Sequence, residues 1–150
     1  MCMPELETKE QKKLVEFLHS AKKTTGKKAV IEALSAVPEQ DLQSTLHIAL
    51  KTIKQSGQFA IASRLIIEHG GEIGLRAMQQ YVTDGKKWPV LAMRSISRSD
   101  QELAFEIMVS VLKSGAVKQR CAAAKYLAER GDLRALVPLS QAVLQPARRN

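Results

Sequence analysis

Breaks between short apolar segments recur along the chain at intervals of about 30 residues. They fall at Pro38, at Gly70-Gly71, near Ser99 and at Gly131. Between the breaks, apolar residues repeat every three or four positions, which is the spacing of one face of an α-helix. No stretch alternates apolar and polar residues for long enough to predict a sheet. The pattern therefore predicts an all-α chain built from repeated helical hairpins.

The segment 120–144 shows one such hairpin most clearly. Ala123 and Leu127 belong to an apolar face that ends at Gly131, where glycine adopts a left-handed conformation without steric cost. Asp132 follows and can cap the next helix by accepting a backbone N–H. The next helix carries its apolar stripe at Leu133, Leu136, Leu139, Val143 and Leu144. Two helices this short cannot bury their apolar faces alone, so the rest of the chain must supply similar pairs to stack on.

This segment resembles a known repeat. The pattern R-x-x-A-A-x-x-L-x-x-x-G-D-x-R-A-x-x-P-L runs from Arg120 to Leu139 and is similar to the HEAT-like repeat of the bilin-lyase type. The resemblance implies an α-solenoid, a stack of helical hairpins in a right-handed array. It informs fold more than function, because HEAT-like arrays serve many unrelated purposes.

We accordingly expect one domain over residues 5–145. A helix over residues 5–20 precedes four hairpins, at about 27–55, 58–83, 87–113 and 117–144. The N-terminal helix is expected to cap the first end of the stack. Residues 1–4 are expected to be flexible, and residues 146–150 to form a basic tail.

Composition narrows the class of protein. The chain has 150 residues, of which 45% are hydrophobic, so it suits a single globular domain with a core. It contains no apolar run of about 18 residues, and its first residues lack the pattern of a signal peptide, so we expect no membrane span. Cys2 and Cys121 form no motif, which favours a reducing cytoplasm.

The net charge of +8 points to nucleic acid, an acidic protein or an anionic membrane surface as a partner, or else only keeps the protein in solution, so the placement of the charges must decide between them. Eight of the 15 acidic residues fall near the turns within hairpins. The connections between hairpins collect cations, which predict a basic rim: Lys22, Lys23, Lys27, Lys28, Lys86, Lys87, Lys113, Lys118 and Arg120. Several of these lysines lie at or just before helix starts, where the helix dipole disfavours cations, so local helix physics does not explain them.

A second surface is expected on the second helices of the hairpins, which line the concave face of HEAT-like stacks. The side chains expected to point outward there are mixed in character: His47, Lys51, Arg76, Gln80 and Arg134. Such a surface suits a peptide or helix from a partner, and it does not have the character of a deep basic groove.

Catalytic patterns are scarce, and we expect neither catalysis nor a metal or other cofactor. The three histidines have no metal-ligand spacing, and Glu68-His69 is the one cluster of possible ligands. No phosphate loop, nucleophile elbow or C-x-x-C motif occurs. Tyr81, Asp84, Lys87 and Trp88 bring to mind the HEAT-like alkylpurine DNA glycosylases, although Trp88 beside Pro89 is better explained as an anchor for the third hairpin.

The sequence thus predicts a non-catalytic binding scaffold or adaptor. It is expected to engage a protein partner through the concave face and the basic rim, and an acidic protein is one candidate. The alternative is a nucleic-acid-binding module that contacts the phosphate backbone without base specificity. A glycosylase-type enzyme is a third and weaker alternative, since aromatic residues make up only 4% of the chain and offer few platforms for base stacking.

Overall fold

The computed structural model describes residues 8–84 and 87–144, and the expected flexible start (1–4) and basic tail (146–150) lie outside these ranges. The described residues form helices and no strands. The elements are α1 Lys9–Ser20, α2 Lys27–Ser35, α3 Glu39–Thr52, α4 Ser56–His69, α5 Gly71–Asp84, α6 Pro89–Ser97, α7 Glu102–Ser114, α8 Val117–Arg130, the 3-10 helix η1 Leu133–Ala135, and α9 Leu136–Leu144. The predicted all-α class is confirmed.

Local capping sets several of these boundaries. α1 begins at Lys9 rather than at residue 5, because Thr8 adopts an extended backbone and forms a capping box with Gln11. α8 ends at Gly131, whose φ of 70° places it in the left-handed region, as predicted. Asp132 accepts a hydrogen bond from the Arg134 N–H at 2.9 Å and so caps the following turn. That turn is a 3-10 helix that leads into α9.

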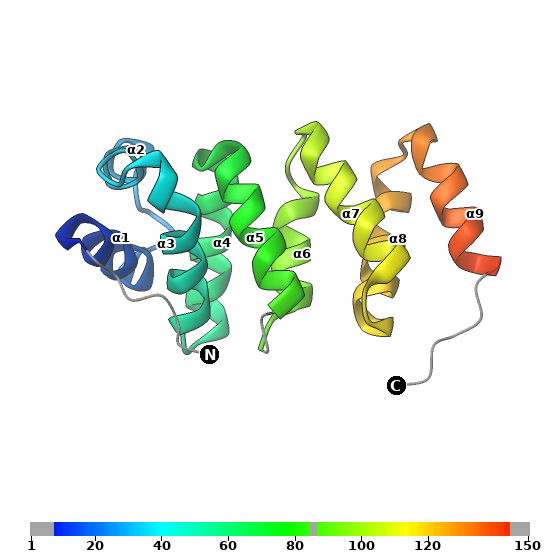
Figure 1. Cartoon of the computed structure of the whole chain (residues 1–150), viewed down its shortest axis with the longest axis horizontal. Coiled ribbons are helices and arrows are strands. Elements are labelled where there is room, and N and C mark those ends of the chain that lie inside the picture. The colour runs from blue at the N-terminus through cyan, green and yellow to red at the C-terminus, as the bar shows by residue number, and fades with distance from the viewer. Residues whose placement is uncertain (1–7, 85–86, 145–150) are drawn as a thin grey trace.

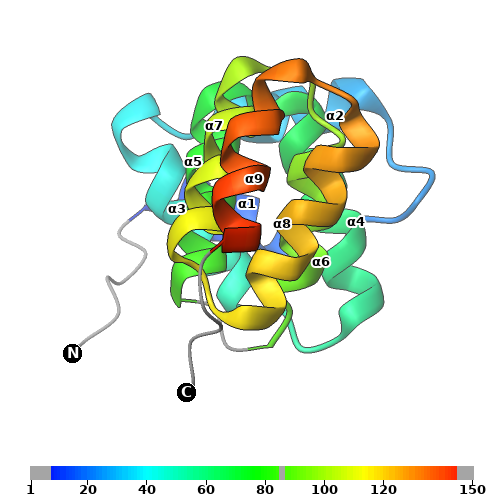
Figure 2. The same ribbon diagram turned by 90° about the vertical axis from the view of Figure 1, so that its right-hand side faces the viewer.

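The helices stack in two layers. α1, α3, α5, α7 and α9 pack against one another in that order and form the odd layer. α2, α4, α6 and α8 do the same and form the even layer. Figure 1 shows the stack from the odd side, and Figure 2 shows α3, α5 and α7 on the left with α4, α6 and α8 on the right. Chain neighbours therefore alternate between layers.

The odd-layer helices α3 and α5 run in the same direction. The side chains of Gln43 and Gln80 meet at 3.5 Å, and those of His47 and Asp84 meet at 2.8 Å. Both contacts join residues 37 positions apart, which requires α3 and α5 to be parallel. Each chain reversal consequently falls on one of two edges. The upper edge of Figure 1 holds the ends of α4, α6 and α8, and the lower edge holds the ends of α3, α5 and α7.

The core lies between the two layers and follows the length of the stack. Phe59, Leu65 and Ile66 of α4 are buried against α5 and α6. Polar contacts fix α1 to the stack: the Gln58 amide donates to the Leu18 and Ala21 carbonyls at 2.8 and 3.0 Å. No helix in the described ranges is long and apolar enough to cross a membrane.

Glycine permits the close approach of α4 and α5. Gly71 has a φ of 59°, a left-handed conformation that suits the turn between these helices. At Gly74, a Cβ atom would lie 2.6 Å from the Ile66 carbonyl oxygen and 3.1 Å from its Cγ2 atom. The backbone oxygen cannot move aside without shifting α4, so the two helices depend on glycine at this crossing.

We predict that Gly74→Ala lowers the free energy of unfolding by about 1–3 kcal/mol, because the added methyl group overpacks the crossing. The matched control is Gly57→Ala in the first turn of α4, where nothing lies within 4 Å of the added Cβ. This control is expected to leave stability unchanged or raise it by up to about 1 kcal/mol. Urea denaturation followed by circular dichroism measures both, and equal effects would contradict the close approach.

Candidate binding surface

Charge is sorted between the two layers. The even-layer helices carry eight Lys or Arg residues and three Asp or Glu residues. The odd-layer helices carry six Lys or Arg residues, three of them in α1, and eight Asp or Glu residues. One broad side of the stack is therefore cationic, and the opposite side is weakly anionic.

The first turns of the helices repeat this division. α3, α5 and α7 each have an acidic residue in the first turn, where it complements the positive end of the helix dipole. α2, α4, α6 and α8 have none, and the residue before each of them makes no side-chain capping hydrogen bond. Lysine lies beside or within these first turns at Lys27, Lys54, Lys87 and Lys118. The positive potential of these helix N-termini adds to that of the lysines.

An apolar groove opens on the lower edge, where α6 and α8 begin. Its volume is about 680 Å³, and two segments line it: 87–91, at the start of α6, and 116–119, at the start of α8. Val90 and Val117 are each 38% exposed there, which is high for valine beside a core. Lys87 and Lys118 belong to the same lining and are exposed. The groove is thus an apolar slot with a cation on each of its two segments.

Aromatic packing holds one wall of the groove in place. The ring of Phe59, which is fully buried, lies 4.8 Å from the ring of Tyr81 and 5.3 Å from that of Trp88. The backbone N–H of Trp88 donates to the Tyr81 hydroxyl at 3.3 Å. Pro89 starts α6, and its fixed φ angle already suits a helix. Burial raises the pKa of Tyr81. Trp88 is half-buried, so one part of its ring anchors α6 and the rest lines the groove.

Two further contacts fix the positions of the groove walls. The Lys87 Nζ atom lies 5.4 Å from the centroid of the Trp88 ring, within the range of a cation–π interaction. The Gln119 amide donates to the Val82 carbonyl at 3.4 Å and ties the start of α8 to the end of α5. Gln58 makes the equivalent contact from α4 to α1. The sequence analysis missed Gln119. The one feature that could have indicated its role is that Gln119 and Gln58 are each the third residue of their helix.

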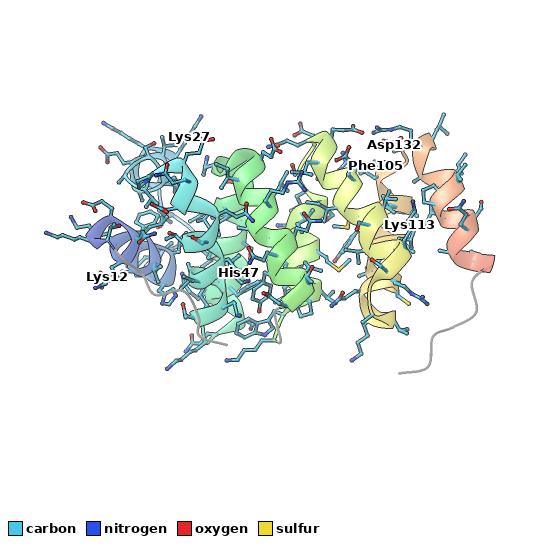
Figure 3. The ribbon with its side chains drawn as sticks, in the orientation of Figure 1. Lys12, Lys27, His47, Phe105, Lys113 and Asp132 are labelled. Carbon is cyan, nitrogen blue, oxygen red and sulfur yellow. The ribbon has the colours of Figure 1, made fainter. Side chains whose placement is uncertain are left out.

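The structure divides the predicted basic rim. Lys87 and Lys118 meet at the groove, and Lys86 lies outside the described residues. Lys27 lies at the upper edge, the same edge as Asp132 (Figure 3), and Lys22, Lys23 and Lys28 are its neighbours along the chain. These four lysines are apart from the groove because the segment before α2 climbs along the α4 side of the stack to the upper edge, as Figure 2 shows.

The remaining rim residues lie elsewhere. Lys113 lines a small hollow between α7 and α9 with Pro138 and Gln141, and Figure 3 shows it away from the lower edge. Arg120 is half-buried, and its Nη1 atom is enclosed. Lys54, which the predicted rim omits, is exposed just before α4 at the lower edge. The exposed lysines at the starts of α4, α6 and α8 on the lower edge are therefore Lys54, Lys87 and Lys118.

Two of the five residues expected on the concave face are held in structural contacts. His47 does not point outward: it is 7% exposed and its Nε2 atom lies 2.8 Å from Asp84 Oδ1, between α3 and α5 (Figure 3). Helical spacing alone puts His47 next to the apolar stripe of α3 and not in it, whereas all six residues from Thr45 to Leu50 are buried. Arg134 bonds Asp132 and Glu102, and its guanidinium lies 4.3 Å from the Phe105 ring centroid. These contacts raise the pKa of Arg134 and lower that of Asp132.

The other three concave-face residues are exposed on the odd layer. Arg76 lies 3.8 Å from Glu72 and donates to Gln79 at 3.3 Å. Gln80 accepts from Gln43, and Lys51 is exposed near the end of α3. This surface is mixed in charge, and the Arg76 guanidinium already faces the Glu72 carboxylate and the Gln79 amide.

The side chains that the sequence suggested as metal ligands or catalytic groups either lie apart or are bonded to other residues. Among the described residues, no group of three His, Cys, Asp or Glu side chains is placed to hold a metal ion. Glu68 lies 3.6 Å from His69 and 3.8 Å from Arg64. In the glycosylase-like cluster, Tyr81 is buried and Asp84 bonds His47.

Comparison of the chain with protein-family models, with curated proteins and with solved structures gave no match. The resemblance to HEAT-like repeats therefore stays a prediction from the residues of segment 120–139.

The Asp132–Arg134 pair predicts a pH effect on stability. The Arg134 hydrogen bonds lower the folded-state pKa of Asp132 below its ordinary 3.8, so the unfolded chain binds the proton more readily. The contribution of this pair is complete above that ordinary value and is lost as the pH falls through the folded pKa. We expect Asp132→Asn, which keeps a capping side chain, to lose less stability than the unaltered chain between about pH 5 and pH 2.

Thermal unfolding at a series of pH values measures this difference. The two proteins should differ above about pH 4 and converge in acid. An unchanged gap at every pH would contradict the assigned role of the carboxylate charge.

Proposed function

We propose that this protein is a non-catalytic binding scaffold that engages a protein partner at the lower-edge groove. We also propose that its two-layered stack is an α-solenoid of HEAT-like hairpins. The parallel packing of α3 and α5 and the Gly131-Asp132 turn support this fold assignment. The partner segment is acidic and carries one or two large apolar side chains. The free thiol of exposed Cys121 suits a reducing compartment such as the cytoplasm.

The groove itself carries the proposal. Its lining of Trp88, Pro89, Val90, Leu91 and Val117 offers an apolar slot of a size that suits two or three side chains. Aromatic and aliphatic side chains of a partner gain free energy by leaving water there. The slot is formed in advance, because Phe59 packs against the Trp88 ring, the Tyr81 hydroxyl holds the Trp88 backbone N–H, and Gln119 ties the start of α8 to α5. A rigid slot costs little ordering entropy on binding.

The cations beside the slot indicate that the partner segment carries negative charge. Lys87 and Lys118 are exposed beside the slot, and Lys54 lies further along the same edge. The uncapped starts of α6 and α8 add positive potential to the same place. Carboxylates on either side of an apolar anchor would therefore meet cations, which steers association and fixes register.

We predict that a fluorescein-labelled peptide with two central leucines between runs of glutamate binds the chain, as measured by anisotropy. Lys87→Glu/Lys118→Glu should weaken this binding about tenfold or more, because both flanking attractions become repulsions. Val117→Ser should weaken it severalfold at constant charge. A peptide with serine in place of the leucines should bind weakly.

The matched control is Lys51→Glu/Lys113→Glu, which makes the same charge change on the odd layer. It should leave the peptide affinity within about twofold of that of the unaltered chain. Both double variants also lower the net charge equally, and salt screens this long-range contribution to binding. Equal losses in the two double variants would show a general charge effect and would contradict the groove. Circular dichroism verifies that each variant is folded.

A second candidate function is supported by a different surface. Arg94 and Arg98 lie close enough to Tyr126 of α8 to lower its pKa, although burial outweighs them and the pKa is raised overall. Arg64 and Arg98 line a hollow of about 270 Å³ between α4 and α6. Exposed Arg94 and Arg98 of α6 and half-buried Arg64 of α4 place cations on successive helices of one broad face, an arrangement that suits the phosphate backbone of a nucleic acid.

The two candidates are separable. If nucleic acid binds, the affinity for labelled duplex DNA or for RNA should fall by orders of magnitude from about 50 to 200 mM salt. Arg94→Glu/Arg98→Glu should then abolish that binding and spare the peptide, and Lys87→Glu/Lys118→Glu should do the reverse. Binding of duplex that is insensitive to Arg94→Glu/Arg98→Glu would exclude the broad even face as a phosphate site.

A further inference from the structure

Lys54 extends the cations of the groove further along the lower edge. It lies two residues before α4, and Lys87 lies two residues before α6, so the two lysines occupy equivalent positions ahead of successive even-layer helices. Both are exposed, as is Lys118 in the first turn of α8. Figure 1 shows the connections that lead into α4, α6 and α8 following one another along this edge. We call Lys54, Lys87 and Lys118 the lysine row.

Packing sets the spacing of the lysine row. The ring of Phe59, in the first turn of α4, lies 5.3 Å from the ring of Trp88, which directly precedes α6. The starts of these two helices are thus direct neighbours, and the starts of α6 and α8 face each other across the groove. Because packed helices have axes about 8–10 Å apart, successive lysines of the row belong to helices one such step apart.

One backbone conformation of a bound segment matches this step. A polyproline II helix has three residues per turn and rises about 3.1 Å per residue, so every third side chain points the same way about 9 Å further on. Along a β-strand, alternate side chains point to opposite faces, and a side chain three residues on points away. The aromatic wall formed by Trp88 also favours polyproline II, since segments in that conformation dock in aromatic-lined grooves.

We propose that the partner segment binds in the polyproline II conformation and carries an acidic side chain at every third residue, opposite the lysine row. This inference rests on the proposed function, because the same groove receives the segment. Of the three ridges of such a helix, the first holds the acids over the lysines. The second places an apolar side chain in the groove beside Val90 and Val117. The third ridge faces solvent, where proline is accepted.

The acid that meets Lys54 lies three residues beyond the acid that meets Lys87. Lys54 borders a hollow of about 390 Å³ that His19 and Gln58 also line, so a carboxylate has room beside the ammonium group. The Gln58 amide donates to two carbonyls at the end of α1, which holds this part of the edge in place. The partner segment therefore contacts the starts of α4, α6 and α8 and extends beyond the groove.

Two labelled peptides of equal charge test the spacing by fluorescence anisotropy. One consists of four Glu-Leu-Pro triplets and the other of four Glu-Leu-Pro-Pro quadruplets, so they carry the same acids and leucines and differ in acid spacing. Proline restricts both to extended conformations. The triplet peptide should bind at least about fivefold more tightly, because its acids stay in register with the lysine row. Equal affinities, or a preference for the quadruplets, would overturn the proposal.

The peptide with two central leucines separates this inference from the proposed function. If that peptide binds and the triplet peptide shows no preference over the quadruplet peptide, the groove stands and the polyproline II register is wrong. If neither that peptide nor the triplet peptide binds, both proposals fail.

A single variant locates the end of the lysine row. Lys54→Glu should weaken binding of the triplet peptide about threefold or more at about 150 mM salt, because an attraction becomes a repulsion. The matched control is Lys27→Glu at the upper edge, which makes the same charge change and should alter the affinity by less than about twofold. Circular dichroism verifies that both variants are folded. Equal losses in the two variants would place Lys54 outside the contact and overturn the proposal.

Discussion

The structure depends on burying one face of each short helix between neighbours of its own layer and the layer opposite. The longest described helices have 14 residues, and isolated helices of that length are marginal in water. α4 shows how the stack compensates: it packs against α1, α2, α3, α5 and α6, and Phe59, Ala62 and Ile66 are fully buried. The same requirement explains α9, which has a neighbour on one side only and leaves aliphatic residues in solvent.

This packing also decides where charge is available. Acidic residues in the first turns of α3, α5 and α7 complement the helix dipoles, so much of the negative charge has a structural use. The lysines near the starts of the even-layer helices have no comparable use. Because the starts of α6 and α8 converge on one edge beside Trp88, these cations border an apolar groove. Function in our proposal comes from cations that the fold does not require.

Sequence reasoning predicted what local chemistry determines. The all-α class, the turn at Gly131 and the cap at Asp132 follow from helical periodicity and from the properties of glycine and aspartate. Sequence reasoning failed for residues whose positions depend on packing between distant segments. His47 fits an outward position by spacing alone, yet it is buried because Asp84, 37 residues away, offers it a partner. The basic rim was expected along one edge, but the path of the chain before α2 moves Lys27 to the other edge. The groove is formed by segments about 30 residues apart, and no local pattern reveals it.

The fluorescence of Trp88, the only tryptophan of the chain, tests the central claim most directly. Titrating the acidic leucine peptide should shift the emission to shorter wavelength as the ring leaves water, with the same dissociation constant that anisotropy gives. Trp88 lines the groove, so a partner seated there must change its surroundings. Peptide binding that is seen by anisotropy and leaves the Trp88 emission unchanged would contradict the account.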